Sequence, residues 1–530
     1  MEGVMTMRTI YVKTEYGMVM GEISGGFGAF KGIPFARAQR FCPPGQISWT
    51  GVKDCRVFGK KAMQVFDGGA PWAKPQSREE FDEDCLNLNI FIPEKALDLT
   101  EDGHIQTPDG HGLPVLVEIH GGAFQTGSNQ EHTPQQMIRD NAFIYVAVNY
   151  RLGVLGFLYV DEILGKPWAG SGNHGILDLM AGVRWVYENI AAFGGNPERI
   201  TLMGSSAGAK AMGAMMCRPE LKKYVHQVIM SSGATQSIRS KATARATARG
   251  FMDVFRQILL KHGYDPQEAP KLLLSVPADL LMEAQKLFCD NPGNTCMFGP
   301  VADGVCFPED CGDIIKYGTF WEGRAMIGSS RHELAFYKMM HPDLAEKAPK
   351  IADRLFEENA PVAKEDFARF FREYCMENGM APSDDVQADW WVKILTDYMY
   401  RLYSYRLAAR LAEKGCQVWQ YTVDLAPALH CFDQQLAFGE PEAAFFKDEA
   451  HMETARIVGK KIYGAFIGFI EKQDPNAYLN PDGEMPCWPC LDPKDPYQMI
   501  WDVQSQAKKI PTGDVLDRFP EDVYRISSAS

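Results

Sequence analysis

Short apolar runs alternate with longer segments of helical period between about residues 115 and 235. Four runs are too short for buried helices and rich in β-branched residues, as strands covered on both faces should be: 115–119, 143–148, 200–203 and 228–230. Apolar positions then recur every three or four residues from Ile176 to Ile190, which predicts a helix that Gly194-Gly195 ends. Asn196-Pro197 predicts the start of another short helix. The alternation indicates an α/β fold with a parallel sheet and right-handed crossovers.

Two later stretches lose the strand pattern. Charged segments of helical period dominate from about 240 to 290 and from about 340 to 412, and we expect helical insertions over one end of the sheet, where a pocket wall commonly lies. Trp390-Trp391 and Phe336 could line such a pocket, although aromatic residues in helices more often belong to the core. We therefore predict one domain over 1–530 with two insertions, and a surface loop over 482–496.

Composition and charge narrow the possible functions. Of the 530 residues, 46% are hydrophobic and 23% charged, as in ordinary soluble globular proteins. A formal net charge of −14 without a Lys/Arg cluster gives no basis for binding nucleic acid or anionic lipid. No run of about 18 apolar residues and no secretion-signal pattern is seen, so we expect no membrane segment and a cytoplasmic location, with secretion after signal removal as the alternative.

The cysteines support the same location. There are thirteen, an odd number, and they are scattered, which favours reduced thiols over a disulfide framework. Cys487-Trp-Pro-Cys490 is an isolated CxxC without a second pair or a nearby His cluster. We interpret it as a coincidence of sequence rather than a metal or redox site.

The stretch Gly204-Ser205-Ser206-Ala207-Gly208 fits the pattern G-x-S-x-G in one register only, with Ser206 as its central serine. A predicted strand runs into the motif, and a segment of small residues and Met leaves it as a predicted helix. A sharp strand-to-helix turn needs neighbours with almost no side chain, and it presents the serine oxygen at the helix N-terminus. Ser206 is therefore the candidate nucleophile, and an ordinary turn serine is the alternative.

A second glycine motif could serve the same chemistry. A serine that attacks an ester carbonyl creates negative charge on its oxygen, and that charge needs hydrogen-bond donors already in place. The segment 120–124, HisGlyGlyAlaPhe, follows the first predicted strand and offers backbone N–H groups that side chains do not obstruct. The N–H groups of Gly121 and Gly122, with that of Ala207, can form an oxyanion hole. A plain glycine turn is the alternative.

A nucleophilic serine also needs a base and an acid. Serine is unreactive at neutral pH alone, so a histidine and an orienting carboxylate are required, in the chain order serine, acid, histidine. His430 lies in a loop after a late apolar run, where the base should be, whereas the other histidines after Ser206 precede a strand or lie in charged helical stretches. For the acid, Glu333 lies just past an apolar, strand-like stretch and Asp303 is its rival; spacing favours Glu333 without deciding between them.

Ordered blocks across nearly the whole chain resemble the type-B carboxylesterases, the cholinesterase-like branch of the α/β-hydrolases. Besides the two glycine motifs, the matching blocks are 31–36, Arg40-Phe41, 83–89, 148–158, 172–178 and 189–197. The resemblance implies the α/β-hydrolase fold, with a central, mostly parallel sheet flanked by helices. It also implies that Arg40 and Glu83 form a structural salt bridge.

The resemblance assigns the remaining site residues. The family's acid ends a G-x-x-x-x-E block, here 328–333, which selects Glu333 over Asp303. The family's histidine begins a block that ends in Phe-Gly, which makes His430 the base. Ser232 matches a serine that, in the family, supports the triad residues without belonging to the triad.

Two departures from the family pattern stand out. Secreted members pair the cysteine equivalent to Cys85 with an earlier one in a Cys-x-Gln pattern, which reads Ala62-Met63-Gln64 here, and this loss fits an intracellular, microbial enzyme. The residue before the nucleophile is commonly Glu and here is Ser205. A neutral neighbour removes a negative charge that would favour the protonated histidine and attract a cationic alcohol, so choline-like esters should be poor substrates.

These observations predict a serine carboxylic-ester hydrolase that acts through an acyl-enzyme on small to medium, uncharged esters, without a metal or an organic cofactor. A feruloyl-type esterase, a lactonase or an amide or carbamate hydrolase would use the same triad. A non-catalytic binding protein on this fold is the alternative from another class, and we disfavour it because all three triad positions are filled. The sequence does not predict the oligomeric state.

Overall fold

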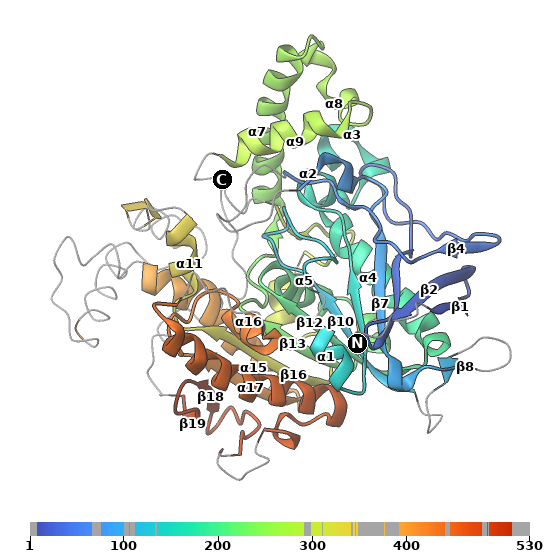
Figure 1. Ribbon diagram of the computed structural model, residues 1–530. Helices are drawn as coiled ribbons and strands as arrows, with labels where there is room; N and C mark the ends of the chain where they lie inside the picture. Colours follow the sequence, from blue (N-terminus) through green and yellow to red (C-terminus); the bar gives the residue numbers. More distant parts are fainter. Residues whose placement is uncertain are drawn as a thin grey trace.

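A large sheet runs through the computed structural model, with helices packed on both of its faces (Figure 1). The residues that the structure describes are 8–65, 76–99, 105–106, 112–132, 135–290, 298–309, 311–340, 343–344, 346–347, 376, 392–439, 446–479, 485 and 487–510.

Thirteen strands form this sheet within the described residues. In spatial order twelve of them are β1 (Arg8–Lys13), β2 (Met18–Ser24), β3 (Phe27–Pro34), β7 (Asn87–Pro93), β11 (Ile144–Val148), β10 (Leu113–Ile119), β12 (Gly195–Ser205), β13 (Gln227–Ser231), β16 (Arg324–Ser330), β17 (Gln417–Val423), β18 (Tyr497–Trp501) and β19 (Gln506–Lys509), and β4 (Val52–Asp54) pairs with β2. The run from β11 to β18 is parallel, and the remaining neighbours along this order are antiparallel. The predicted α/β fold with a mostly parallel sheet is thus confirmed.

The central strands are apolar throughout because they are covered on both faces. In β10, Val115 and Val117 enter the core on one face of the sheet, whereas Leu116 enters the core on the other. This alternation follows from the two-residue period of a strand. The four apolar runs predicted as strands are found in β10, β11, β12 and β13, except that Phe143 of the run 143–148 precedes β11.

Helices fill the connections between these strands. Those of the main fold are α1 (Gln135–Asp140), α2 (Gly153–Phe157), α3 (Asp161–Leu164), α4 (His174–Asn189), α5 (Ala207–Met215), α6 (Leu221–Tyr224), α10 (Cys311–Lys316), α11 (Glu333–Met340), α16 (Phe432–Phe438) and α17 (Glu449–Lys472). The helix predicted over 176–190 is α4, and it continues as the 3₁₀ turn η5 (Ile190–Phe193). Gly194, at φ 82°, ends that turn as predicted.

The short helix predicted at Asn196-Pro197 is wrong, because this segment belongs to β12. The local signal is present, since the Asn196 side chain accepts a hydrogen bond from the N–H of Glu198 at 2.9 Å. Pairing of Gly195 with Leu113 of β10 keeps the chain in the sheet, with a register shift that accommodates the turn. Tertiary pairing therefore overrides the local capping preference.

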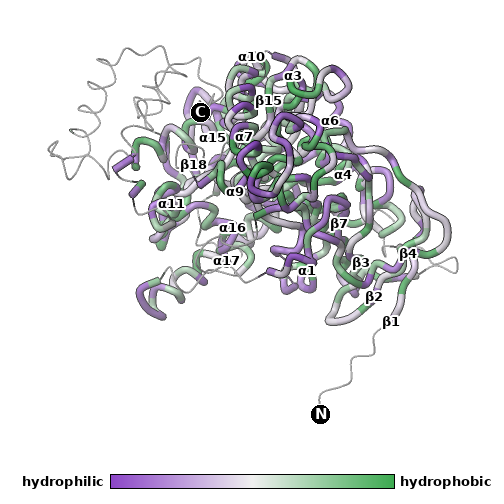
Figure 2. Tube along the Cα trace, turned by 90° about the horizontal axis from the view of Figure 1, so that it is seen from above, coloured by the Kyte–Doolittle hydropathy of each residue, from purple (hydrophilic) through white to green (hydrophobic). Residues whose placement is uncertain are grey.

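The first predicted insertion is helical. It holds α7 (Lys241–Lys261), α8 (Ala269–Leu272) and α9 (Ala278–Cys289), which stand together at one end of the molecule (Figure 1). Both α7 and α9 carry apolar residues on a buried face, and the hydropathy colouring shows apolar and polar residues mixed along them (Figure 2). Among the described residues, three short strand pairs lie outside the main sheet: β5 (Lys61–Ala62) with β6 (Phe81–Asp82), β8 (Asp98–Leu99) with β9 (Ile105–Gln106), and β14 (Arg239–Ser240) with β15 (Val301–Ala302).

The second predicted insertion is described only in part. Its last portion is helical, with the π-helical turn η8 (Asp397–Arg401) followed by α15 (Leu402–Glu413). Residues 348–375 and 377–391, including Trp390 and Trp391, lie outside the described residues. In the predicted loop 482–496, the described residues form neither helix nor strand, and the division into a single domain stays a prediction.

Candidate active site

Ser206 lies at a sharp turn between β12 and α5. Its backbone has φ 52° and ψ −121°, a conformation that an L-residue adopts only under strain. Its N–H donates to the carbonyl of Ser231 at 2.9 Å, and its carbonyl accepts from the N–H of Lys210 at 2.9 Å. A Cβ on Gly208 would lie 2.1 Å from the carbonyl oxygen of Ile119, so the turn requires glycine there.

Ser206, His430 and Glu333 form a continuous hydrogen-bonded chain. Ser206 Oγ lies 2.7 Å from Nε2 of His430, and Nδ1 of His430 lies 2.5 Å from Oε2 of Glu333. The other Glu333 oxygen accepts from the N–H of Ser330 at 2.7 Å, and the Glu333 side chain is fully buried. The structure therefore brings together the three residues that the sequence singled out.

Asp303 has a different role. One of its oxygens accepts the N–H groups of Val305, Cys306 and Phe307, and the other accepts from Nδ2 of Asn173 at 2.8 Å. The carboxylate thus holds a turn and is absent from the chain of contacts to Ser206. This agrees with the choice of Glu333.

The segments that carry the acid and the base are tied to each other. The Arg331 guanidinium contacts both oxygens of Asp424 at 2.9 and 3.1 Å, and the N–H of His332 donates to the carbonyl of Ala428 at 2.9 Å. Ser232 Oγ accepts from the N–H of Cys431 at 3.1 Å. Ser232 therefore supports the backbone next to His430, where the sequence placed a supporting serine.

The segment 120–124 lies directly against the nucleophile turn. A Cβ on Gly121 would lie 3.1 Å from the carbonyl oxygen of Ser205 and 3.3 Å from Cβ of Ser206. Gly122 adopts φ 97°, which turns the chain within a few residues. Ala207 is the first residue of α5, so its N–H has no partner within that helix. Gly121, Gly122 and Ala207 are thus placed around the serine.

His120 fixes this loop, a role that sequence reasoning missed. Its ring stacks on Tyr150 at 4.5 Å between centroids, and the Tyr150 hydroxyl donates to the His120 carbonyl at 3.1 Å. Burial lowers the pKa of His120 to about 4, so the ring is neutral at pH 7. Nδ1 lies 3.0 Å from the Gly121 carbonyl, as expected if it donates there.

A buried polar cluster behind the triad was also missed. Asp433 Oδ1 accepts from Ser231 Oγ at 2.5 Å, and Oδ2 accepts from the Tyr421 hydroxyl. Burial raises the pKa of the Cys431 thiol well above its usual range, and a hydrogen bond with Ser205 opposes this shift. Asp433 stands three residues after His430, and this spacing was the only available sequence signal.

Aromatic rings surround the imidazole of His430. Ring centroids of Phe336, Tyr337 and Tyr400 lie 6.0, 5.4 and 5.0 Å from that of His430. Phe336 and Tyr337 are only half-buried, and Tyr400 is buried. Phe336 therefore lies at the wall of the site, which was one of the two options that the sequence left.

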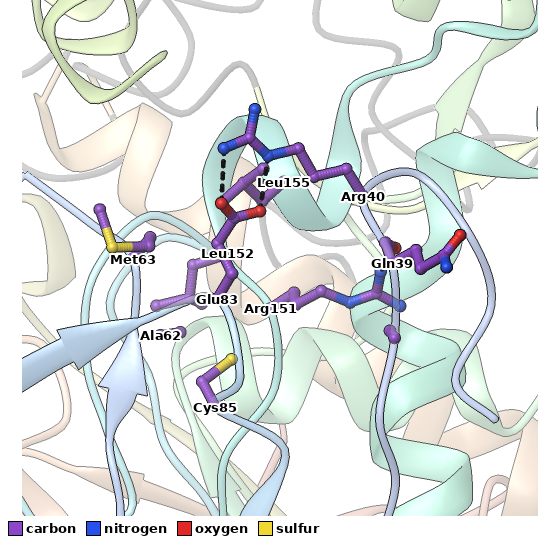
Figure 3. Close-up of a pocket in the computed structure, with 10 residues that line it drawn as sticks. Gln39, Arg40, Ala62, Met63, Glu83, Cys85, Arg151, Leu152 and Leu155 are labelled. Carbon is purple, nitrogen blue, oxygen red and sulfur yellow. Dashed lines mark hydrogen bonds and ion pairs between the residues drawn. The ribbon is translucent and has the colours of Figure 1, made fainter. Parts of the chain in front are cut away.

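The predicted Arg40–Glu83 salt bridge is present, at the small pocket drawn in Figure 3. Two guanidinium nitrogens of Arg40 contact the Glu83 carboxylate at 2.6 and 2.5 Å (Figure 3). Ala62 and the buried Cys85 line the same pocket, and burial raises the pKa of that thiol. The alanine thus occupies the neighbourhood of Cys85, where the resemblance places the partner cysteine of secreted relatives.

A mostly parallel sheet with a serine after one strand, an acid after a later strand and a histidine after the next defines a hydrolase of the α/β-hydrolase fold. A family model described as the carboxylesterase family matches residues 8–515. The chain therefore belongs to the carboxylesterase family, and it is an enzyme that hydrolyses carboxylic esters through a serine. The alternative of a non-catalytic binding protein is not retained.

Named relatives agree with this assignment. The phenmedipham hydrolase of Pseudarthrobacter oxydans is 28% identical over 527 residues, which cover 92% of this chain and 94% of that protein. The para-nitrobenzyl esterase of Bacillus subtilis is 33% identical over 331 residues, 61% of this chain and 62% of that one. The solved carboxylesterase EST55 of Geobacillus stearothermophilus at pH 6.2 superposes with a TM-score of 0.79 at 29% identity, covering 96% of this chain and 100% of that structure.

Two further properties concern only the part of the chain that the structure describes. There, the helices are all too short or too polar to traverse a lipid bilayer. The same residues contain no group of three or more His, Cys, Asp or Glu side chains arranged to hold a metal ion.

Proposed function

We propose that Ser206 is the nucleophile of this esterase, with His430 as its general base and Glu333 as the acid that orients the imidazole. The observation that carries this is the hydrogen-bonded chain from Ser206 Oγ through His430 to Glu333, at 2.7 and 2.5 Å. His430 accepts the serine proton as Oγ attacks the ester carbonyl carbon, and it returns a proton to the leaving alcohol. Water then cleaves the acyl-enzyme by the same route.

The N–H groups of Gly121, Gly122 and Ala207 would hold the oxyanion of both tetrahedral intermediates. Their positions against Ser206 support this role. Each such donor contributes roughly 2.7–4 kcal/mol to transition-state stabilisation in comparable enzymes.

Substitutions of the two adjacent serines distinguish the nucleophile from its neighbour. Ser206→Ala should lower kcat by roughly 10⁶-fold, as loss of the nucleophile does in other serine hydrolases. Ser205→Ala should keep much of the activity, because Ser205 contacts Cys431 rather than His430. A fluorophosphonate probe should label the wild type and Ser205→Ala at Ser206, and should not label Ser206→Ala. Labelling at another residue would refute the assignment.

For the substrate, we propose small to medium, uncharged esters. Ser205 supports this, because a serine supplies no negative charge beside the triad to attract a cationic alcohol. Acetylcholine and its neutral isostere 3,3-dimethylbutyl acetate form a matched pair, and the neutral ester should have the higher kcat/KM. Ser205→Glu should narrow or reverse that preference and raise the apparent pKa in the pH profile of kcat/KM. Unchanged values for both would contradict the idea.

Carbamate or amide hydrolysis with the same triad is the second candidate. It is favoured by the similarity to a phenmedipham hydrolase over 92% of this chain. A panel that varies acyl length, aromatic acyl groups and alcohol size, with phenmedipham included, ranks the two by kcat/KM.

A cytoplasmic location is proposed as well. It is supported by the eleven cysteines of the described residues, all of which are free thiols. Fractionation of the producing cells tests it.

A further inference from the structure

Asp433 is a buried carboxyl group to which the proposed hydrolysis gives no role. It is 1% exposed and lies in the first turn of α16, three residues after His430. Its two oxygens accept hydrogen bonds from Ser231 Oγ in β13 and from the Tyr421 hydroxyl in β17. A single side chain thus joins α16 to two strands of the central sheet.

These contacts lead to both partners of the proton transfer. On one side, the Ser231 carbonyl accepts the N–H of Ser206, and Ser231 is paired with Ser205 in the register of β12 and β13. On the other side, Asp433 is part of the helix that directly follows His430. The path from nucleophile to base through Asp433 is short and lies within the buried interior.

A second side chain from the first turn of α16 also joins this helix to the central sheet. Gln434 donates through Nε2 to Oε1 of the buried Glu118 in β10 at 2.7 Å. The strand β10 continues into the loop that contains Gly121. The beginning of α16 is therefore fixed to the sheet at more than one strand.

We propose that Asp433 is a positioning residue of this esterase, whose hydrogen bonds to Ser231 and Tyr421 hold His430 in register with Ser206. The inference rests on the proposed function, because it presumes that Ser206 and His430 exchange a proton. A shift of about 1 Å between two such groups lowers turnover by roughly 10²-fold, so the hydrogen bonds act on kcat more than on substrate binding.

Asp433 acts through the two hydrogen bonds that its carboxyl group accepts. Burial raises the pKa of Asp433 most, the hydrogen bonds from Ser231 and Tyr421 lower it, the negative charge of Glu333 raises it, and the net shift is upward. An asparagine amide has the same shape and can keep a hydrogen bond at both positions, since its oxygen accepts from Ser231 and its NH₂ donates to the Tyr421 oxygen. The amide should therefore replace the acid.

Steady-state kinetics of Asp433→Ala and Asp433→Asn on a neutral ester test this. The concentration of active sites is measured by titration with a fluorophosphonate, so that misfolded protein is excluded from the calculation of kcat. Asp433→Ala should lower kcat by roughly 10- to 100-fold with KM within about threefold, and Asp433→Asn should stay within about threefold of wild type in both. If Asp433→Ala fails to fold, Tyr421→Phe replaces it and should lower kcat by roughly three- to tenfold.

Thr422→Val is the matched control. Thr422 neighbours Tyr421 on β17, is buried, and donates a hydrogen bond to Gln498 at 2.8 Å, away from the triad. It should lose stability but keep kcat. The inference is overturned if Asp433→Ala or its substitute keeps wild-type kcat, if Asp433→Asn falls as far as Asp433→Ala, or if Thr422→Val loses kcat equally. Absence of probe labelling at Ser206 in the wild type would instead overturn the proposed function itself.

Discussion

Gly121→Ala tests the oxyanion loop by a small displacement. The added Cβ would lie 3.1 Å from the Ser205 carbonyl oxygen and 3.3 Å from Ser206 Cβ, a few tenths of an ångström closer than an ordinary contact. Complete loss of one oxyanion donor costs roughly 2.7–4 kcal/mol. A partial displacement forfeits part of that, so we expect kcat to fall by roughly 10- to 50-fold with KM within about threefold.

Alanine substitutions at two other glycines serve as comparisons for Gly121→Ala. Gly122→Ala should prevent folding, because φ is 97° and the Cβ would lie 2.1 Å from the Thr126 carbonyl oxygen. Gly263, just after α7, also has a positive φ of 79° but faces open space, so Gly263→Ala should cost about 1 kcal/mol of stability and leave kcat unchanged. Steady-state kinetics per titrated active site, with urea unfolding alongside, measure both effects. If Gly121→Ala keeps wild-type kcat, or Gly263→Ala loses kcat as well, the reasoning is refuted.

Two predictions concern stability. The Arg151–Asp178 pair is buried and joined by contacts of 2.8 and 2.7 Å, so Asp178→Leu should lower the free energy of unfolding by about 3–5 kcal/mol, measured by urea titration, because it leaves a buried cation without its partner. Burial, with the charge of Arg151, lowers the pKa of His174 to about 3. As the pH is lowered from 6.5 to 3, the unfolded chain therefore binds a proton at this histidine and the folded chain does not, so the free energy of unfolding decreases as the pH decreases in that window. His174→Gln should reduce the loss of unfolding free energy between pH 7 and pH 5 by about 2 kcal/mol, and an unchanged loss would show that another group is responsible.

Much of the fold followed from the sequence because it depends on local periodicity. The strands around β10 and β12 are short apolar runs, and α4 repeats every three or four residues, so both signals lie within one element. Asn196 shows the limit of this approach. Its side chain makes the turn contact that a helix start would use, yet pairing across to Leu113, more than eighty positions away in the chain, decides the conformation.

The site residues divide in the same way. Ser206 and Gly121 each belong to a motif of five consecutive residues that indicates its chemistry without further context, so they could be predicted. Asp433 and Tyr421 carry no such motif, and their importance comes from meeting inside the protein. The neutral state of His120 likewise follows from its burial against Tyr150, which no local pattern encodes.

The order of the strands explains why the base needs more support than the nucleophile. Ser206 follows β12 and His430 follows β17, which are three strand spacings apart in the order β12, β13, β16, β17, or about 14 Å. The seven residues 424–430 could span roughly 23–25 Å when extended, so the length of the loop leaves the position of His430 undetermined. Trp501 of β18 accepts the N–H groups of Asp424 and Leu425 at the start of the loop. Two further contacts come from the strands in between: Ser232 after β13 accepts the N–H of Cys431, and Arg331 after β16 contacts Asp424. The supporting serine therefore fits the topology, since the chain from β17 back to Ser206 crosses β13 and β16, and Ser232 and Arg331 directly follow those two strands.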